Sequence, residues 1–223
     1  WHAEFLDRIG CDNDSVMVVH GGGMYGDKLA TMQRWVTNFS RLPKSVQRRL
    51  VLENCEKCFN IKDCLWVSEN TKKNGIQIPV VFDTHHYDCY AQMHPDEKFH
   101  KDGASHYISD IIKTWQNRNI KPKFHVSEQK PNSRIGAHSD FIENIPNYLL
   151  EIPGKYGTQI DIMIEAKLKE QAIRKLYTKY GSLFDPEVFP QSKKSKAVFK
   201  VSSKKKAVFK SKTTQHSMPL DTN

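Results

Sequence analysis

The chain has 223 residues, 38% of them hydrophobic, and a formal net charge of +9. This length can bury one core, and the lack of any long apolar stretch excludes a membrane-spanning segment. Nine lysines and one acid, Asp221, lie after residue 190, so residues 1–190 hold 25 basic and 24 acidic residues, which excludes an overall positive field as the means of binding a nucleic acid.

The five cysteines are expected to be reduced. Their number is odd and no secretory signal precedes them, which argues against a disulfide framework. Cys55 and Cys58, with Cys64 behind them, lack the second pair that a structural zinc would need. We therefore expect an intracellular protein, in the nucleus or the cytoplasm. Because the chain begins at Trp1 rather than at a methionine, we expect an excerpt or a processed product.

Five short apolar runs, each ending in a polar side chain, predict five buried parallel strands. The runs are Val16–Val19 ending in His20, Leu50–Leu52 ending in Glu53, Ile78–Phe82 ending in Asp83, Lys121–Phe124 ending in His125, and Ile160–Ile164 ending in Glu165. Helix-like segments separate the runs, so all five polar ends should meet on one face. An α/β barrel builds its active site in this way.

Helices are predicted in the connections between these strands, from the spacing of apolar residues and from capping residues. The first predicted helix ends at Gly10. The others cover residues 28–39 with Asp27 as the cap, 45–49, a segment from Asn60 or Asp63 to 74, 108–115, 141–150 and 169–180. Residues 87–106 and 126–140 are predicted to be loops. The five units take about 184 residues, whereas a complete barrel takes ~250, so we expect three units to precede Trp1.

The chain is expected to divide into a barrel domain, residues 1–184, and a lysine-rich low-complexity tail, residues 185–223. Within the tail, Ser192–Lys200 is nearly repeated as Ser202–Lys210. Such a composition cannot bury a core. Two interpretations stay open: a solvated appendage, or a nuclear-import signal or DNA tether.

The side chains at the strand ends predict a metal centre. The candidate ligands are Glu53, Asp83, His125 and Glu165, with His20 at the fifth strand end and with His86 and His138 as an outlying third site. Mixed carboxylate and imidazole ligands suit manganese, zinc or iron rather than calcium. Two metals ~3.5–4 Å apart are the usual device for hydrolysing a phosphodiester. A single histidine is more often structural, but the recurrence at strand ends favours the metal interpretation.

Two neighbouring features are weaker signals. Adjacent residues on a strand point in opposite directions, so His85 should face away from the centre if His86 faces it. The run Gly21–Gly23 permits close approach to a ligand, and Lys28 could meet a phosphate, although a tight βα turn explains the glycines equally well.

These residues closely resemble the ultraviolet-damage endonuclease family. The motifs that carry the resemblance are Val-Val-His20-Gly-Gly-Gly-Met-Tyr-Gly-Asp-Lys28, Leu-Glu53-Asn54, Phe-Asp83-Thr-His-His86, Thr114-Trp115, Pro-Lys123-Phe-His125-Val-Ser, His138-Ser-Asp140 and Asp161-Ile-Met-Ile-Glu165-Ala-Lys-Leu-Lys-Glu170. They span about residues 1–180 in order. The resemblance implies a TIM-type (β/α)8 barrel similar to those of endonuclease IV and xylose isomerase, present here as about five βα units.

The resemblance also implies a DNA repair endonuclease that uses two or three manganese ions, with zinc or iron as alternatives. It would nick damaged double-stranded DNA immediately 5′ to a pyrimidine dimer or another helix-distorting lesion, leaving a 3′-hydroxyl. The implied ligand roles are that Glu53 bridges two metals, Asp83, His125 and Glu165 complete one of them, His20 helps to hold the second, and His86 and His138 hold the third.

Further implied roles concern catalysis and DNA. Glu53, Glu165 and Lys123 would be catalytic, and Lys123 matches a lysine that is carboxylated in some members. Carboxylation requires a low amine pKa, which burial near metals would favour. The residues expected to contact DNA are Lys28, Tyr25 and Arg134.

The chain departs from the family in two respects. Cys55-Glu56 follows Leu-Glu53-Asn54 where the family is commonly acidic. The family's first three strands supply another histidine to the His20 metal and the residues that probe the lesion, and these are absent from the sequence. We expect a monomer whose barrel an N-terminal segment completes.

Three other functions stay open. The same barrel could be an abasic-site endonuclease or a metal-dependent sugar isomerase, although an isomerase would have no use for a lysine-rich tail. A truncated barrel could instead bind DNA or a protein partner through its tail without catalysis.

Overall fold

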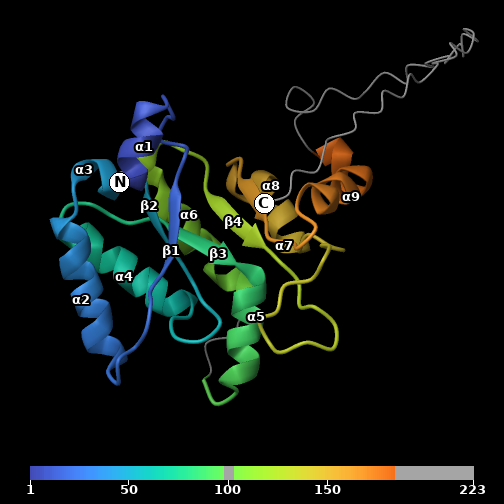
Figure 1. Cartoon of the computed structure of the whole chain (residues 1–223), viewed down its shortest axis with the longest axis horizontal. Coiled ribbons are helices and arrows are strands. Elements are labelled where there is room, and N and C mark those ends of the chain that lie inside the picture. The colour runs from blue at the N-terminus through green and yellow to red at the C-terminus, as the bar shows by residue number, and fades with distance from the viewer. Residues whose placement is uncertain (98–102, 184–223) are drawn as a thin grey trace, which may run out of the picture. The chain divides into compact units, whose positions relative to one another are not determined.

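A sheet of five parallel strands forms the centre of the protein (Figure 1). The computed structural model describes residues 1–97 and 103–183, so the predicted tail, 185–223, lies outside the described residues. The strands are β1 (Met17–His20), β2 (Leu50–Glu53), β3 (Val80–Asp83), β4 (Lys123–Val126) and β5 (Asp161–Ile164). They neighbour one another in sequence order, and each neighbouring pair is parallel. The five predicted strands and the α/β class are confirmed.

Helices fill the connections between these strands. Their bounds are α1 (His2–Arg8), α2 (Lys28–Arg41), α3 (Lys44–Gln47), α4 (Ile61–Lys73), α5 (Thr84–Met93), α6 (Ile108–Trp115), α7 (Asn147–Leu150), α8 (Ile152–Tyr156) and α9 (Glu170–Tyr180). Short 3-10 turns cover Ala104–Tyr107, Gln116–Arg118 and Gly181–Leu183. No helix among residues 1–97 and 103–183 is long and apolar enough to cross a membrane.

The caps explain where two of the predicted helices begin. The Asp27 carboxylate accepts the backbone N–H of Ala30 at 2.9 Å and begins α2. Asn60 and Asp63 form a reciprocal capping box at the start of α4, in which each side chain accepts the backbone N–H of the other residue. Both satisfy amide donors that the first helical turn leaves unpaired.

Two predicted segments are wrong. Residues 87–93 belong to α5 rather than to a loop, because the Asp83 carboxylate accepts the N–H of His86 at 2.7 Å and begins a helix directly at the strand end. Within the predicted helix 141–150, only Asn147–Leu150 is helical. There, one Glu128 carboxylate oxygen accepts the N–H groups of Glu143 and Asn144, so these backbone donors are satisfied outside a helix.

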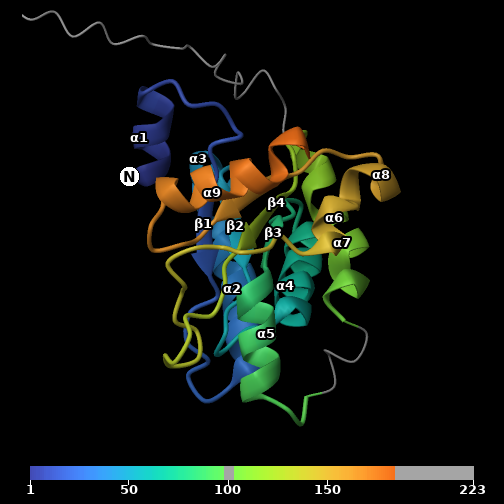
Figure 2. The same ribbon diagram turned by 90° about the vertical axis from the view of Figure 1, so that its right-hand side faces the viewer.

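The core lies along the three central strands. Val51, Val81, Phe82 and Phe124 are fully buried, and the indole of Trp115 donates to the Val80 carbonyl at 2.8 Å. Helices α2 and α4 pack against each other, and α6 packs against β3 (Figures 1 and 2). The strands at the two sides of the sheet, β1 and β5, are only half-buried.

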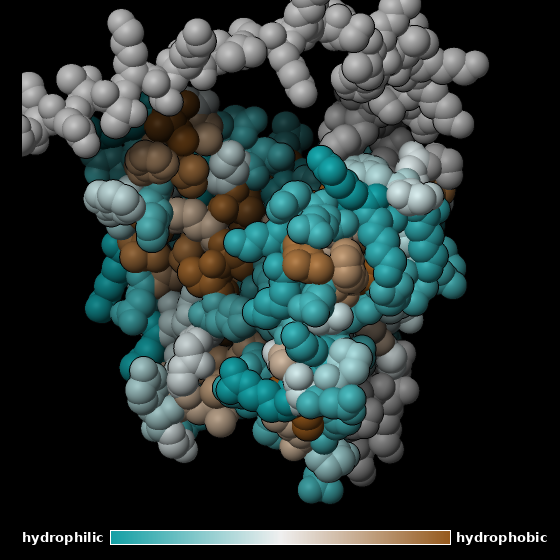
Figure 3. All heavy atoms as spheres, turned by 45° about the vertical axis from the view of Figure 1, so that its right-hand side comes forward, coloured by the Kyte–Doolittle hydropathy of each residue, from teal (hydrophilic) through white to brown (hydrophobic). Residues whose placement is uncertain are grey.

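Apolar side chains are also exposed on and beside α1. Trp1, Phe5 and Ile9 are 84%, 51% and 57% exposed. On the face drawn in Figure 3, an area of apolar residues lies beside a strongly hydrophilic one.

The amino ends of the strands are held by buried cations. Arg49, which precedes β2 and is 1% exposed, pairs with Asp7 and donates to the carbonyls of Cys11, Asp12 and Ser15. The guanidinium therefore ties α1 and the following loop to the sheet, because it satisfies carbonyls that have no strand partner.

Candidate metal centre

The register of the parallel strands brings the predicted ligands together at the carboxyl end of the sheet. His20 lies opposite Glu53, and Asp83 lies opposite His125. Glu165 directly follows β5, and its N–H donates to the carbonyl of Val126 at 3.1 Å. The strand pairing therefore brings the five strand ends together, as the sequence predicted.

Glu53 lies between two histidines. One carboxylate oxygen, Oε1, is 2.7 Å from His125 Nδ1, and the other, Oε2, is 3.1 Å from His20 Nε2. His125 Nδ1 is also 3.1 Å from Glu165 Oε1. Glu53 is 2% exposed, so its two oxygens serve two different neighbours inside the protein. This is the arrangement that a carboxylate bridging two ions requires.

Three groups of side chains among the described residues could each hold a metal ion. Within each group, ligand atoms lie within 4.8 Å of one another. The groups are Glu53, His125 and Glu165; Glu53, Asp83 and His86; and His20, Glu56 and His86. Nitrogen and carboxylate oxygen bind divalent ions at about 2.0–2.2 Å, so small movements would close each group on an ion.

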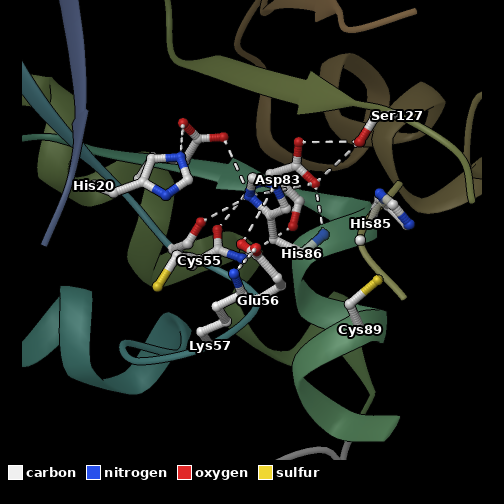
Figure 4. Close-up of polar contacts among 12 residues, drawn as sticks. His20, Cys55, Glu56, Lys57, Asp83, His85, His86, Cys89 and Ser127 are labelled. Carbon is white, nitrogen blue, oxygen red and sulfur yellow. Dashed lines mark hydrogen bonds and ion pairs between the residues drawn. The ribbon is translucent and has the colours of Figure 1, made fainter. Parts of the chain in front are cut away.

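Asp83 is fixed by its neighbours. The Asn54 side chain accepts the N–H of Asp83 at 2.9 Å and donates to the Asp83 carbonyl at 3.0 Å. The Asp83 carboxylate accepts the N–H of His86, and the Ser127 hydroxyl lies 3.3 Å from one of its oxygens (Figure 4). Burial raises the pKa of Asp83.

His85 and His86 lie on α5 rather than on a strand, so strand alternation does not apply to them, but His86 and not His85 belongs to the candidate metal groups, as expected. Both are buried. The ring of His86 is 5.1 Å from that of His20 and 5.9 Å from that of His138, and the ring of His85 is 5.5 Å from that of His138. His85 Nε2 meets the side-chain oxygen of Gln129 at 3.2 Å. Figure 4 shows both histidines at the start of the helix, with His86 among the residues of the centre and His85 on the side of Cys89.

Hydrogen bonds between carboxylates and histidines shift the pKa values of the centre. Burial raises the pKa of Glu53, but hydrogen bonds from His125 and His20 outweigh it and lower that pKa to about 2. Hydrogen bonds with Cys55 and Glu53 raise the pKa of His20 to about 10. Burial lowers the pKa of His125, but hydrogen bonds with Glu165 and Glu53 raise it to about 10. The carboxylates therefore favour the protonated form of both imidazoles, and a divalent cation would have to displace those protons.

Lys123 has a raised amine pKa rather than the low one that carboxylation requires. It begins β4, and its ammonium group lies 2.8 Å from Asp14 Oδ1 and 2.6 Å from Asp161 Oδ2. Burial lowers its pKa, but these two carboxylates outweigh burial and the pKa is raised. A protonated amine does not react with carbon dioxide, so this environment opposes carboxylation.

The predicted DNA contacts have different surroundings. Lys28 is paired with Asp63 Oδ2 at 2.6 Å and with the Tyr90 hydroxyl at 3.1 Å, so it is not free to meet a phosphate in this arrangement. Tyr25 is 87% exposed, and Arg134 is exposed in the loop after β4. A Cβ on Gly21 would lie 2.6 Å from the Phe59 ring, so packing explains this glycine.

Glu56 is the residue of the centre that the sequence reasoning did not select. It lies in the loop after β2, three residues beyond Glu53, and its Oε2 is 3.9 Å from His86 Nε2. Glu56 does not lie at a strand end, so the recurrence that marks His20, Glu53 and Asp83 does not extend to it. Its only signal in the sequence was the acidic side chain at this short spacing from Glu53.

Comparisons with known proteins agree on one family. The family model described as "UV-endonuclease UvdE" matches residues 1–195. The protein named "Putative UV-damage endonuclease" from Acanthamoeba polyphaga mimivirus is 38% identical over 181 residues, which are 80% of this chain and 51% of that protein. The "UV DNA damage endonuclease" of Bacillus velezensis is 35% identical over 186 residues, 82% of this chain and 54% of that protein.

A solved structure gives the same result for the fold. The crystal structure of SacUVDE is similar with a TM-score of 0.64 and 30% identity, over 82% of this chain and 56% of that chain. This similarity confirms the predicted barrel type of α/β fold. The chain spans about half the length of the curated relatives it matches.

Proposed function

The chain belongs to the UV-endonuclease UvdE family, and on this basis we propose that it is a DNA repair endonuclease for ultraviolet damage. Its reaction would be hydrolysis of the phosphodiester bond 5′ to a photoproduct or another helix-distorting lesion. The observation that supports this most directly is the position of Glu53, whose two oxygens face His125 and His20.

The donor set fits divalent metals. Each candidate group combines carboxylate and imidazole ligands, which suits manganese, with zinc or iron as alternatives. When bound, such ions would supply Lewis acidity toward the phosphate and the attacking water. The residues proposed to hold them are Glu53, Asp83, His125 and Glu165 around one ion, with His20 at a second position and with His86 and His138 completing the outer part of the centre.

The carboxylates of the chain would have different roles because they differ in exposure. Glu53 is buried and tied to two histidines, so it can hold a fixed negative charge between two cations. The Glu165 side chain is 35% exposed, whereas those of Glu53 and Asp83 are 3% and 0% exposed. Glu165 is therefore the carboxylate most accessible to water and to a DNA phosphate.

Damaged double-stranded DNA is the proposed substrate. Exposed Tyr25 can stack on a base or a sugar, and Arg134 can pair with a phosphate. Lys28 would have to break its ion pair with Asp63 before it could bind a phosphate, so we expect it to contribute less to DNA binding than Tyr25 and Arg134.

A nicking assay tests this function. The chain is incubated with manganese and ultraviolet-irradiated duplex DNA, beside undamaged and abasic duplexes and an EDTA-treated sample. We expect nicks immediately 5′ to the lesion. Glu165→Gln should lower the rate by roughly 100-fold or more, because it removes a negative charge at the centre. It should lower the melting temperature measured in EDTA only slightly, through the weaker pair with His125, and leave the fold intact.

The matched control is Glu151→Gln, which changes an exposed glutamate in the same chemical way. It should nick at the wild-type rate. Nicking that survives EDTA, or that Glu165→Gln does not slow, would contradict the proposal. Preference for the abasic duplex over the irradiated one would favour the abasic-site alternative.

A further inference from the structure

A hairpin in the loop after β4 projects from the carboxyl end of the sheet, beside α5 (Figures 1 and 2). It covers residues 129–138, whose ends, Gln129 and His138, pair as an antiparallel bridge. Between them, Arg134 is exposed and Ile135 is 42% exposed. A single exposed isoleucine is ordinary on a protein surface. This one is different because the protein fixes the loop that carries it.

The side chain of Gln129 orders the turn of the hairpin. Its amide nitrogen donates to the carbonyls of Lys130 at 3.0 Å and Arg134 at 2.9 Å. Its oxygen accepts the N–H of Gly136 at 2.9 Å. One amide therefore holds the backbone on both sides of Ile135, so placing this side chain against a partner costs little conformational entropy.

His85 and Glu56 fix the hairpin to the rest of the protein. Because the Gln129 nitrogen donates to carbonyls, its oxygen is the acceptor, and His85 Nε2 donates to that oxygen at 3.2 Å. A Cβ on Gly136, which has a φ of +84°, would lie only 3.3 Å from Cγ of Glu56. The hairpin is thus packed against both α5 and the loop after β2, which limits its motion.

The hairpin ends at the metal centre. His138 Nδ1 lies 3.4 Å from Glu165 Oε2. Ile135 precedes His138 by three residues, and three residues of chain span at most about 11 Å. One DNA strand rises ~3.4 Å per nucleotide, so this span corresponds to about three nucleotides. The isoleucine is therefore close enough to act on the bases beside a phosphate bound at the centre.

Arg134 and Ile135 combine two kinds of contact that proteins make with a distorted duplex. Cations pair with phosphates, whereas apolar side chains such as isoleucine insert between bases and unstack them. Unstacking costs least where a lesion has already weakened the pairing, so an inserted side chain selects damaged sites. Resting on the repair function proposed above, we propose that Ile135 inserts into the duplex beside the lesion while Arg134 holds a neighbouring phosphate.

DNA binding with manganese tests this inference separately from hydrolysis. It is measured by fluorescence anisotropy in the Glu165→Gln chain, for an irradiated and an undamaged duplex that carry 2-aminopurine opposite one pair of adjacent thymines. Ile135→Ser added to that chain should lower the preference for the irradiated duplex by roughly tenfold, because the burial of an isoleucine is lost from the complex. It should also abolish the rise in 2-aminopurine fluorescence that accompanies unstacking. Ile135→Leu should keep both signals.

Ile9→Ser is the matched control, since Ile9 is 57% exposed and follows α1 at the amino end of the sheet. It should keep the preference and the fluorescence rise. Equal melting temperatures of the chains with and without Ile135→Ser would establish that a lost preference does not report a lost fold.

Gln129 is a positioning residue and has its own test. Gln129→Met keeps the length of the side chain but removes its hydrogen bonds, so the preference for the irradiated duplex should fall by about threefold. Gln116→Met, which changes an exposed glutamine after α6 in the same way, should keep it. Arg134→Gln should weaken binding to both duplexes alike and lower the salt slope by about 1.

The remaining outcomes distinguish the two proposals. A full preference and an unchanged fluorescence rise in Ile135→Ser, or an equal loss in Ile9→Ser, would overturn the inference. If Ile135→Ser loses the preference and no form of the chain nicks irradiated DNA, the role of Ile135 in binding holds and the proposed hydrolysis fails. If the wild type nicks irradiated DNA and Ile135→Ser nicks it with the same preference, the function holds and the role of Ile135 fails.

Discussion

Both ends of the five-stranded sheet bury charged side chains, but the two ends balance those charges differently. At the amino end, Arg49 and Lys123 are cations that pair with aspartates, and Arg49 also satisfies backbone carbonyls. At the carboxyl end, carboxylates meet histidines. The amino end thus supplies its own permanent cations, whereas the positive charge at the carboxyl end consists of exchangeable protons.

This difference suits one end to a structural role and the other to binding a metal ion. A guanidinium cannot lose its proton in a protein, so Arg49 stays charged and its partners stay paired. An imidazolium can release its proton when a divalent cation arrives. A cluster whose cations can be exchanged is therefore suited to binding a metal ion, and a cluster whose cations are permanent is suited to holding parts of the fold together.

The largest expected effect comes from removing Arg49, which holds the amino end of the sheet. Arg49→Ala would remove the guanidinium that pairs with Asp7 and donates to the carbonyls of Cys11, Asp12 and Ser15, which should lower the free energy of unfolding by about 3 kcal/mol. Glu53→Gln, at the other end, should cost only about 1 kcal/mol without metal, because His20 and His125 can respond by losing their protons. Urea denaturation in EDTA measures both values, and equal losses would contradict the comparison.

A pH profile sharpens the same comparison. The pKa values of His20 and His125, about 10, lie above the ordinary value of 6.5, so the stability they contribute is fully present below pH 6.5 and is lost as the pH rises toward 10. The pKa of Glu53, about 2, lies below 4.5, so its contribution is fully present above pH 4.5 and is lost as the pH falls toward 2. Without metal, the protein should therefore be most stable between pH 4.5 and 6.5.

Thermal unfolding in EDTA across this range measures the profile. Saturating manganese should remove the decline above pH 6.5, because the metal then replaces the protons as the source of positive charge. A metal-free profile that stays flat from pH 6 to 9 would show that the histidines do not hold their protons.

The smallest expected effect concerns Lys123. Its carboxylate partners, Asp14 and Asp161, are 49% and 35% exposed, so solvent screens the pairs and Lys123→Gln should cost only about 1 kcal/mol. Manganese affinity should change by less than about twofold, because the ammonium group is already neutralised by these partners rather than by the centre. A bicarbonate-dependent gain in manganese affinity, present in the wild type and lost in Lys123→Gln, would instead show that the lysine is carboxylated.

Local signals made the sheet predictable. Each strand is a short apolar run closed by a polar residue, and the parallel arrangement follows from the helical segments between the runs. Because parallel strands share one carboxyl end, the approach of His20, Glu53, His125 and Glu165 to one another followed from the order of the elements alone.

The errors came from residues with two roles and from distant partners. Asp83 is both the last residue of β3 and the cap of α5, so the sequence marked a strand end but not the helix that begins there. Glu56 reaches the centre because the loop after β2 turns back, with the Cys55 N–H bonded to the Phe59 carbonyl at 2.9 Å. The partner of Lys123, Asp14, lies 109 residues away, and no local pattern identifies such a pair.

The side chain of Asn54 acts as a backbone residue would, since its amide both donates to and accepts from the main chain of Asp83. It continues the pairing of β2 with β3 beyond the two residue pairs, Leu52 with Val80 and Glu53 with Val81, that the strands themselves form. The carboxylates of Glu53 and Asp83 are thereby set at a fixed spacing before any ion arrives. The time needed to load the centre should consequently be set by the arrival of the ion and the loss of its water, not by a slow rearrangement of the chain.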